Sequence, residues 1–323
     1  MPMTQPHAIL DEWRTILGAN PRLGDRAEGR DLWPVTAECG ASCMLKRLGP
    51  WRNLPLADEA RVLAHLSRCG ISVAEFIPTD RASLYAGELA ECFVLMPRLE
   101  QDAFDAAEVI AHETAIGNAV ARLHLALARY PWPVNSYTED LAGALHRDLM
   151  LPPDLVAAHA HHQKEMIAHL ASLPVQMIHG DLTPDNILLR KPGIVSGFID
   201  FDHLPTGPRL WDIGKYLSRR IRLRWRGHPV DDATRLAHLT SFLAGYHQLN
   251  PLTPNEISAL PAAIAAGNFL EASYHAEISA GILPRRRMPD HDAVLADTIE
   301  AARWHLTHDH HESIAAAVRA GTA

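Results

Sequence analysis

The chain has 323 residues, a net charge of −8, 47% hydrophobic residues and 21% charged residues, which is the composition of an ordinary globular protein with one large or two modest cores. This balance excludes a disordered or fibrous chain, and the negative charge argues against nucleic acid as a general partner. The N-terminus has no cationic start before an apolar run, and no segment is apolar for long enough to span a membrane. We therefore expect a cytoplasmic protein without a membrane partner.

The first third of the chain predicts a hairpin, a helix and a further strand. Residues 31–47 place β-branched and aromatic residues on both sides of a turn at 38–42. Residues 56–70 repeat apolar positions at helical spacing and end at Gly70. The apolar run 91–99 then meets Pro97, which predicts a strand that enters an extended connector. We place a boundary here, between a lobe of residues 1–97 and a lobe of residues 98–323.

The remainder of the chain is mostly helical in pattern. Residues 106–130 keep an apolar period near that of a helix and contain no proline. Beyond Gly207 the pattern predicts helices over 211–223, 233–248, 254–278 and 291–318. The order of elements predicts an α+β fold, with a small antiparallel-sheet lobe that carries one main helix and a larger, mainly α-helical lobe.

Two polar motifs lie between short apolar runs in the second lobe. In HGDLTPDN, Asp181 and Asn186 are five residues apart, and Asp200 of GFIDFD comes fourteen residues after Asn186. Phosphoryl transfer needs a carboxylate that accepts the proton of the acceptor hydroxyl, and oxygen ligands that hold Mg²⁺ against the nucleotide phosphates. Asp181 suits the first role, and Asn186 with Asp200 suits the second. Turns at the ends of the adjacent strands ILL and GFI would bring the three side chains together.

The first lobe is expected to supply a cation for the donor phosphates. Lys46 lies in the strand-like stretch CMLKRL and fits this role, and Glu59 on the next helix has the charge and position to hold it. The polar turn GDRAEGRD, from Gly24 to Asp31, is a candidate for covering the phosphates with backbone N–H groups, although it has few glycines for that purpose.

Together these residues resemble the aminoglycoside phosphotransferase and choline kinase-like family, whose bilobal fold is similar to that of protein kinases. The resemblance covers residues 17–217 and rests on HGDLTPDNILL, GFIDFD and LWDIGKYL, and more loosely on MLKRL, the helix with Glu59 and RLH at 122–124. It implies that Asp181 is the catalytic base and that Asn186 and Asp200 are magnesium ligands. It also implies that Lys46 and Glu59 form the ion pair that positions the phosphates of ATP or GTP.

The same resemblance implies further contacts. Adenine would lie against the connector backbone from Met96 to Arg98, and Asp212 would brace the catalytic loop from behind. Where protein kinases have Asp-Phe-Gly, this chain reads Asp200-Phe201-Asp202. Asp202 is therefore a candidate for a further metal or acceptor contact.

The acceptor is expected to be a small molecule. Only eleven residues separate Asp200 from Asp212, which is too short for the segment on which protein kinases dock a peptide. Its pocket would be built by the helical remainder, where Glu271 and Glu277 are candidate contacts beside Asp202.

Several residues are interpreted as structural. His179 is read as a hydrogen-bonded brace of the loop and His124 as a packed helix residue. The histidine-rich stretches at 159–162 and 305–311 are read as polar helix ends or a ragged terminus rather than a zinc site. The arginines from Arg219 to Arg226 are read as a solvated helix face. The four cysteines, which show no paired spacing, are expected to be buried free thiols: Cys39, Cys43, Cys69 and Cys92.

The leading functional hypothesis is an ATP- or GTP-dependent O-phosphotransferase, a monomer or homodimer, that modifies an antibiotic of the aminoglycoside or nucleoside type. The alternative is a metabolic kinase resembling homoserine, methylthioribose or choline kinases, and the chemistry of the motifs does not separate the two. The arginines at 219–226 and 285–287 make the last third locally basic, which favours a less cationic acceptor. A catalytically inactive nucleotide-binding scaffold is a third hypothesis, against which the intact Asp181, Asn186 and Asp200 argue.

Overall fold

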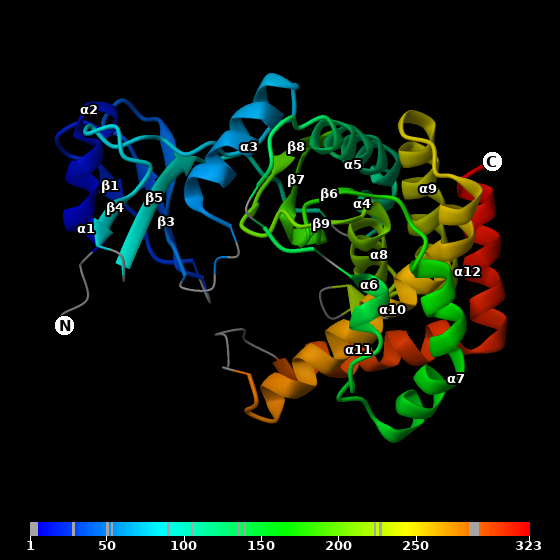
Figure 1. Cartoon of the computed structure of the whole chain (residues 1–323). Helices are drawn as coiled ribbons and strands as arrows, with labels where there is room; N and C mark the ends of the chain where they lie inside the picture. Colours follow the sequence, from blue (N-terminus) through cyan, green and yellow to red (C-terminus); the bar gives the residue numbers. More distant parts are fainter. Residues whose placement is uncertain are drawn as a thin grey trace.

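The computed structural model describes residues 6–27, 30–49, 52, 54–88, 91–104, 106–134, 136–138, 140–222, 224–225, 228–283 and 291–323. It has two lobes, a small one around a five-stranded antiparallel sheet and a larger one built mainly from helices (Figure 1). The predicted α+β, bilobal fold class is confirmed. None of the helices in these ranges is both long enough and apolar enough to cross a membrane.

The sheet of the small lobe has the strand order β1-β2-β3-β5-β4, and all neighbouring strands are antiparallel. Its strands are β1 (Arg22–Leu23), β2 (Leu32–Thr36), β3 (Ser42–Arg47), β4 (Ala86–Glu88) and β5 (Glu91–Pro97). The hairpin predicted over 31–47 is the pair β2–β3, and its turn contains Gly40 with a positive φ of 89°. In β3, Lys46 pairs with Leu32 on one side and Val94 on the other, so its backbone is fixed from both sides.

Short helical turns before the sheet complete the core of the small lobe. They are α1 (Pro6–Ile9), η1 (Leu10–Trp13) and α2 (Arg14–Leu17). Trp13 and Leu17 are fully buried against the sheet residues Leu45 and Phe93. The indole N–H of Trp13 donates to the carbonyl of Ile77 at 2.7 Å. This cover was not predicted, because three very short helical segments leave too little periodicity to detect.

Helix α3 (Leu56–Arg68) connects the small lobe to the large one. It ends as predicted, because Gly70 has a positive φ and the N–H groups of Gly70 and Ile71 cap the carbonyls of Ser67 and Leu66. Its buried face, which includes Leu63 and Leu66, belongs to the core of the large lobe. The helix therefore packs on the large lobe, although it follows β3 of the small lobe in the chain.

The large lobe contains two short antiparallel strand pairs among its helices. The first pair is β6 (Val175–Met177) with β9 (Thr206–Pro208), and the second is β7 (Ile187–Arg190) with β8 (Ile194–Phe198). A third small pair is formed by β10 (Arg224–Trp225) and β11 (His228–Pro229). The helices are α4 (Ala106–Ile110), α5 (Glu113–Ala128), α6 (Leu141–Ala144), α7 (Pro153–Leu170), η2 (Pro184–Asn186), α8 (Arg209–Arg220), α9 (Asp232–Leu249), α10 (Pro254–Ser279), α11 (His291–Leu306) and α12 (His308–Gly321).

Two helices that were predicted as continuous are each interrupted. The helix over 106–130 breaks into α4 and α5, because the chain turns at Ala111 and His112. The His112 ring packs edge-on against Phe104 and over Gly193, a tertiary contact that local periodicity does not contain. The helix over 291–318 likewise breaks at Thr307 into α11 and α12. At the first break a contact distant in sequence outweighs helix propensity.

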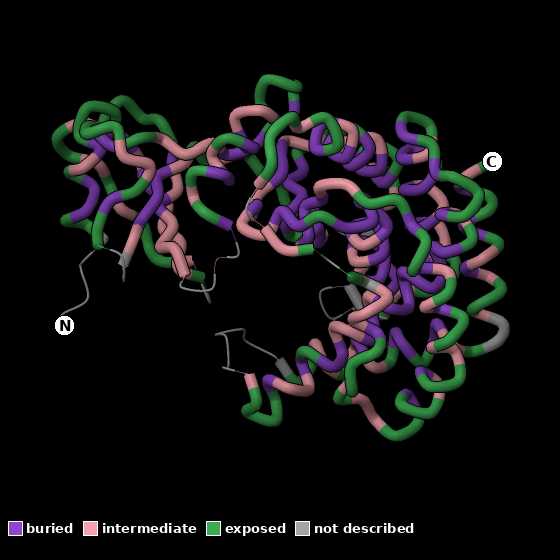
Figure 2. The backbone as a smooth tube through the Cα atoms, in the orientation of Figure 1, coloured by how far each residue is buried: buried purple, intermediate pink, exposed green. Residues whose placement is uncertain are grey.

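The helices of the large lobe pack closely around a single core. In Figure 2 the buried stretches of α5, α8, α9 and α10 lie toward the interior of the lobe, and exposed stretches lie on its outer turns. Helix α5 crosses α9 at two glycines: a Cβ on Gly117 would lie 2.0 Å from the carbonyl oxygen of Phe242, and one on Gly245 would lie 2.0 Å from that of Thr114. The core therefore depends on glycine at this crossing.

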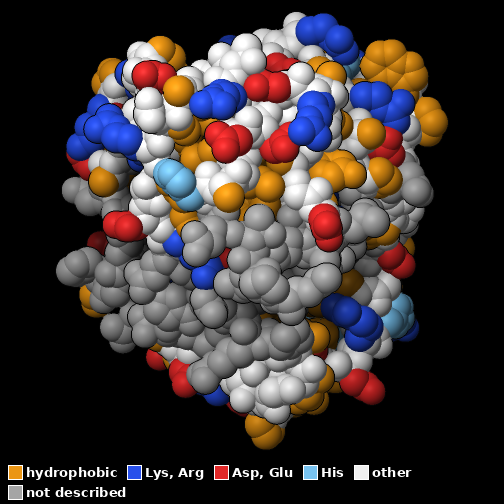
Figure 3. Space-filling model, turned by 90° about the vertical axis from the view of Figure 1, so that its left-hand side faces the viewer, with side chains coloured by type: hydrophobic (Ala, Val, Ile, Leu, Met, Phe, Trp, Pro, Cys, Tyr) orange, Lys and Arg blue, Asp and Glu red, His pale blue; other side chains and the backbone are white. Residues whose placement is uncertain are grey.

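The cysteine and histidine predictions are corrected in part. The cysteines are free, but only Cys43 is buried, and Cys39 and Cys69 are exposed. His159 and His305 are buried inside α7 and α11, so these stretches are not merely polar helix ends or a ragged terminus. Figure 3 shows the side of the molecule where the small lobe lies, and there basic and acidic side chains are interspersed among the coloured residues.

Candidate active site

The loop after β6 is held from behind by a buried aspartate. The carboxylate of Asp212, on α8, accepts hydrogen bonds from the backbone N–H groups of His179 and Gly180 at 2.8 and 2.9 Å. His124 of α5 lies 3.1 Å from the same carboxylate. Burial alone would raise the pKa of Asp212, but the hydrogen bonds from His124 and His179 lower it below its usual value. The predicted bracing role of Asp212 is confirmed, and His124 is the packed helix residue that was expected.

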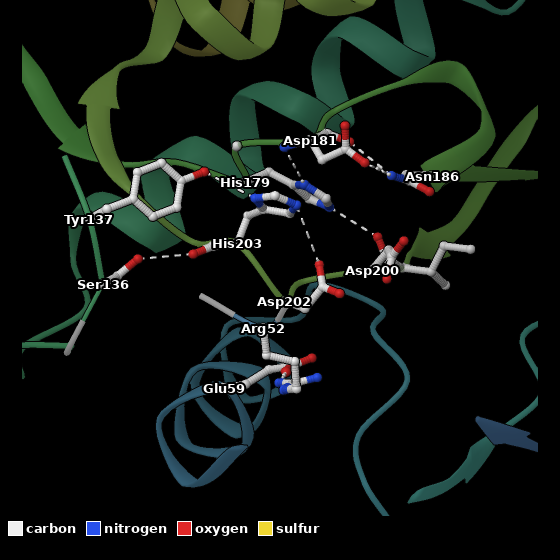
Figure 4. A network of polar contacts seen from close by, with 12 residues as sticks. Arg52, Glu59, Ser136, Tyr137, His179, Asp181, Asn186, Asp200, Asp202 and His203 are labelled. Carbon is white, nitrogen blue, oxygen red and sulfur yellow. Dashed lines mark hydrogen bonds and ion pairs between the residues drawn. The ribbon is translucent and has the colours of Figure 1, made fainter. Parts of the chain in front are cut away.

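His179 fixes the loop against the second motif. Its Nε2 lies 3.0 Å from the carbonyl oxygen of Ile199, so this nitrogen is the donor and Nδ1 accepts the N–H of Asp181 at 3.3 Å. Its ring also packs against Phe201. In addition, the N–H of Ile199 donates to the carbonyl of Asn186. The two polar motifs are thereby joined, as Figure 4 shows, and the predicted role of His179 as a brace is confirmed.

The side chain of Asp181 binds Lys215, a lysine that the sequence analysis did not single out. Its Oδ1 lies 2.5 Å from Nζ of Lys215 on α8. The amide nitrogen of Asn186 donates to the carbonyl of Asp181 at 2.8 Å and to its Oδ2 at 3.3 Å. Burial raises the pKa of Asp181, but Lys215 and the nearby Arg219 lower it by more, so that the pKa is about 2. The carboxylate is therefore ionised at every pH at which the protein would be assayed.

Asp200 lies at the end of β8 in a strained backbone conformation. Its φ is +68°, in the left-handed region that costs energy for a residue with a side chain and that is frequent at functional sites. Its Oδ1 is 2.5 Å from Nζ of Lys46, and Asp202 lies 3.9 Å from the same nitrogen. Burial raises the pKa of Asp200, and Lys46 lowers it more strongly. The neighbouring charge of Asp181 opposes this, so the two carboxylates influence each other.

The predicted ion pair between Lys46 and Glu59 is replaced by two other pairs. Glu59 binds the guanidinium of Arg52, while Lys46 binds Asp200 (Figure 4 shows the Arg52–Glu59 pair). Lys46 and Glu59 nevertheless lie near enough that each alters the pKa of the other. Burial raises the pKa of Glu59 above its usual value despite both cations. The pairing is wrong in detail, but the two residues do lie at one site.

A cavity of about 30 Å³ marks the seam between the lobes at this site. Lys46, Glu59, Met96 and Asp200 line it, together with Phe198 at the end of β8. Met96 thus lies beside Lys46 and Asp200, and the contact of the connector with adenine stays a prediction. Arg98 is exposed and its N–H donates to the carbonyl of Ser42, so this amide is already engaged in the sheet. The phosphate-covering loop predicted at 24–31 lies partly outside the described residues.

The predicted acceptor contacts lie in different settings. Asp202 is near Lys46 and is 3.8 Å from Nε2 of His203, whose Nδ1 is 3.0 Å from the hydroxyl of Tyr137 (Figure 4). Glu271 on α10 is instead bound by Arg219 and Arg222, which lower its pKa well below the usual value although burial raises it. Glu277 accepts a hydrogen bond from Ser273.

The basic run 219–226 is therefore not a solvated helix face where it is described. Arg219 and Arg222 hold Glu271, and Arg220 is buried beside Glu113. A charge pattern alone does not distinguish an exposed face from buried ion pairs whose partners lie elsewhere in the chain. Arg226 lies outside the described residues.

The oxygen atoms at the seam fit Mg²⁺ bound together with a nucleotide. Asn186 donates its amide nitrogen to Asp181, which leaves the amide oxygen for a ligand, and Asp200 offers a carboxylate that Lys46 binds through one oxygen. One or two protein oxygen ligands are usual for a magnesium ion that completes its shell with phosphate oxygens and water. Among the described residues, no group of three or more histidine, cysteine, aspartate or glutamate side chains is arranged to hold a metal ion.

A sheet lobe that presents a lysine to an aspartate of a helical lobe, beside a loop braced by a second, buried aspartate, is the arrangement of a protein kinase-like fold. The profile of the phosphotransferase enzyme family matches residues 23–252. The chain belongs to this family.

Solved structures share this fold over nearly the whole chain. An amicoumacin kinase in complex with AMP-PNP, Ca²⁺ and amicoumacin has a TM-score of 0.68 and 18% identity, and the match covers 96% of this chain and 97% of that one. A microcompartment-associated aminopropanol kinase has a TM-score of 0.70 and 16% identity, over 92% of this chain and 94% of that one. At this identity the likeness establishes the fold.

Relatives in sequence include two homoserine kinases. The enzyme of Neisseria meningitidis serogroup B is 30% identical over 212 residues, which are 63% of this chain and 65% of the relative. The enzyme of Beijerinckia indica subsp. indica is 31% identical over 218 residues, which are 64% of each chain. The chain thus spans about 65% of the length of these relatives.

Proposed function

We propose that the protein is an ATP- or GTP-dependent kinase that phosphorylates the hydroxyl group of a small amino-acid-type alcohol, with homoserine as the first candidate. The observation that carries the proposal is the pairing of two aspartates with two lysines at the seam: Asp181 with Lys215, and Asp200 with Lys46. Both carboxylates thus attract a positive charge, which phosphoryl transfer requires of Asp200 as a ligand of the metal ion and of Asp181 as the base that takes the hydroxyl proton.

Each residue has a defined task in this mechanism. Lys46 binds a phosphate oxygen of the nucleotide, while Asn186 and Asp200 would hold Mg²⁺, which supplies positive charge to the phosphates when it is bound. Asp181 orients the acceptor hydroxyl and takes its proton as the hydroxyl oxygen bonds to the γ-phosphorus and the bond to the nucleoside diphosphate breaks. The low pKa of Asp181 keeps it in the ionised form that this task needs.

The charges around Asp181 favour an acceptor that carries a carboxylate. Lys215 and Arg219 lie one turn apart on α8, and both lower the pKa of Asp181. The acid Glu271 is bound by Arg219 and Arg222. Lys215 and Arg219 would repel a polycationic aminoglycoside, whereas they would attract the carboxylate of an amino-acid alcohol. The homoserine kinase relatives support the same choice, and the antibiotic hypothesis is retained as the competing outcome.

The test is release of the nucleoside diphosphate with Mg²⁺ and a panel of acceptors. We expect turnover with L-homoserine and little with kanamycin, and loss of turnover on adding EDTA. The Asp200→Ala variant should lose about a thousandfold or more in kcat, because electrostatic stabilisation dominates this chemistry. Asp185→Ala is the matched control, since Asp185 is exposed on the same loop. Nucleotide binding without turnover on any acceptor would identify a scaffold and defeat the proposal.

A second comparison isolates the acceptor carboxylate. The substrate 3-aminopropan-1-ol keeps the amine and hydroxyl of homoserine but lacks the carboxylate. We expect kcat/KM for it to be lower than for homoserine by about tenfold or more, since a charge-assisted pair is lost. Arg219→Met should reduce this preference, and Arg219→Lys should retain part of it. Equal kcat/KM values for the two substrates would show that the acceptor carboxylate is not recognised.

A further inference from the structure

The large lobe contains a cavity of about 570 Å³ among α7, α10, α11 and α12. None of its lining residues belongs to the active site described above. Its volume lies in the range of about 300–1,000 Å³ that is usual for small-molecule sites. In Figure 1, α7 and α11 lie in the lower part of the helical lobe, α10 descends toward them and α12 runs up the right-hand edge of the lobe.

The cavity has an apolar wall because small residues of α10 face it. Pro261, Ala262 and Ala265 line it from α10, opposite Met166 of α7 and Val318 of α12. Alanine side chains leave space that longer side chains would fill. Pro261 lies inside the helix and has no N–H, so the carbonyl of Ile257 one turn earlier lacks its usual helical donor. The wall thus combines apolar surface with a residue, Ile257, whose carbonyl lacks its helical donor.

One buried polar side chain also lines the cavity. His305 is only 1% exposed, and neither of its ring nitrogens has a hydrogen-bond partner of good geometry among the described residues. The carbonyl of Pro261 lies beside the ring. Burial and the neighbouring His311 lower the pKa of His305 to about 3, so its imidazole is neutral. A neutral imidazole offers one donor and one acceptor: the carbonyl of Pro261 faces the donor, and the acceptor has no partner among the described residues, which is unfavourable in the interior.

The lining excludes two kinds of occupant. His162 and His311 lie near His305, but no group of three or more potential ligands in the described part of the chain could hold a metal ion. A charged head group at the depth of His305 would lose its hydration against an uncharged imidazole and apolar walls. The rim carries both signs, with Glu165 beside His169 and Arg319 nearby, so it selects neither an anion nor a cation.

We propose that this cavity is a second small-molecule site, which takes an uncharged, mostly apolar organic molecule whose hydroxyl or amide group hydrogen-bonds to His305. The body of the molecule lies against Met166, Pro261 and Ala262. The site is separate from the phosphoryl-transfer centre and does not depend on the function proposed for it.

The test uses two probes of the same shape, 2-naphthol and 2-methylnaphthalene, titrated calorimetrically into the full chain. We expect 2-naphthol to bind about tenfold more tightly, because only it can hydrogen-bond to His305. In His305→Phe both probes should bind with similar affinity. Equal affinities in the unmodified protein, or binding of neither probe up to its solubility limit, would overturn the proposal.

Two further measurements locate the site. Ala315→Phe places a large ring on the cavity wall and should weaken binding of both probes at least tenfold. Ala316→Phe is the matched control, because Ala316 is exposed and is not part of the wall. If a variant does not fold, crystals of the unmodified protein soaked with 6-bromo-2-naphthol decide the matter: the anomalous bromine signal lies among α7, α10 and α12, or the proposal is wrong.

Discussion

Carboxylates paired with cations occur in two regions of this molecule, and the two sets are built differently. At the seam between the lobes, Asp181 and Asp200 are each bound by a lysine, and their side chains remain 30% and 39% exposed. In the helical core, Glu113 has no exposed surface and is bound by Arg220, Tyr216 and His238 from α8 and α9. The core carboxylate is saturated, whereas the seam carboxylates keep oxygen atoms that face solvent.

The difference shows what each arrangement can do. A lysine is a compact charge on a flexible stem, and its bond to a carboxylate exchanges readily for a metal ion or a substrate group. An arginine with tyrosine and histidine donors fixes a buried carboxylate from several sides, and breaking such a set leaves an uncompensated charge. Substitutions at the seam should therefore affect turnover, and substitutions in the core should affect stability.

The largest effect is expected for Asp181→Asn. This change keeps the size of the side chain but removes the base and the partner of Lys215, so kcat should fall by about a thousandfold or more. The melting temperature should change little, because the pair is partly solvated. Diphosphate release and thermal unfolding measured on the same preparation check both statements. Activity within tenfold of the unmodified enzyme would remove Asp181 from the role of base.

Glu113→Gln tests the core set and should have the opposite outcome. The neutral amide leaves Arg220 buried without its counter-charge, which should lower the free energy of unfolding by about 3–5 kcal/mol. The kcat of the protein that remains folded should be nearly unchanged, since Glu113 lies behind α8. Urea unfolding gives the first quantity and kcat per folded molecule the second. A loss of kcat with unchanged stability would contradict the division between the two regions.

The sequence predicted the seam much better than the core. Asp181, Asn186 and Asp200 lie in two dense motifs whose spacing implies a loop and a hairpin, and these elements are present as β6, β7 and β8. The partners of Glu113 lie 103 and 125 residues away along the chain at Tyr216 and His238, so no local pattern indicates them. The same limitation explains why the basic run 219–226 was taken for a solvated face and why Lys215 was overlooked.

Lys215→Met should produce an intermediate effect that depends on pH. The pKa of Asp181 is lowered from 3.8 to about 2 in the folded protein, so its contribution to stability is present above its ordinary pKa and is lost as the pH falls through about 2. Without Lys215, burial is offset less fully, so the pKa of Asp181 should rise, and because the pair is partly exposed, stability at neutral pH should fall by less than about 1 kcal/mol.

The same substitution should also change the pH profile of turnover. The acid limb of kcat/KM that follows the ionisation of Asp181 should move to higher pH than in the unmodified enzyme, where the pKa of Asp181 is about 2. Lys215→Arg keeps the charge and should show no such movement. Identical profiles for Lys215→Met and the unmodified enzyme would show that Lys215 does not control the ionisation of Asp181.

The smallest effect is expected at Arg52, whose partner Glu59 lies between the two classes. The pair is well buried, with side-chain exposures of 14% and 6%, as in the core, yet it lines the seam cavity next to Lys46. We expect Glu59 to belong to the seam, with Lys46 replacing Arg52 as its partner, so that Arg52→Met costs less than about 1 kcal/mol of unfolding free energy. A cost of about 3 kcal/mol or more would contradict this and place Glu59 in the core class, because the change would then leave a buried charge unpaired. Urea unfolding with and without Mg²⁺-ATP separates these cases, because an exchangeable pair should be sensitive to the nucleotide, whereas a saturated core pair should not.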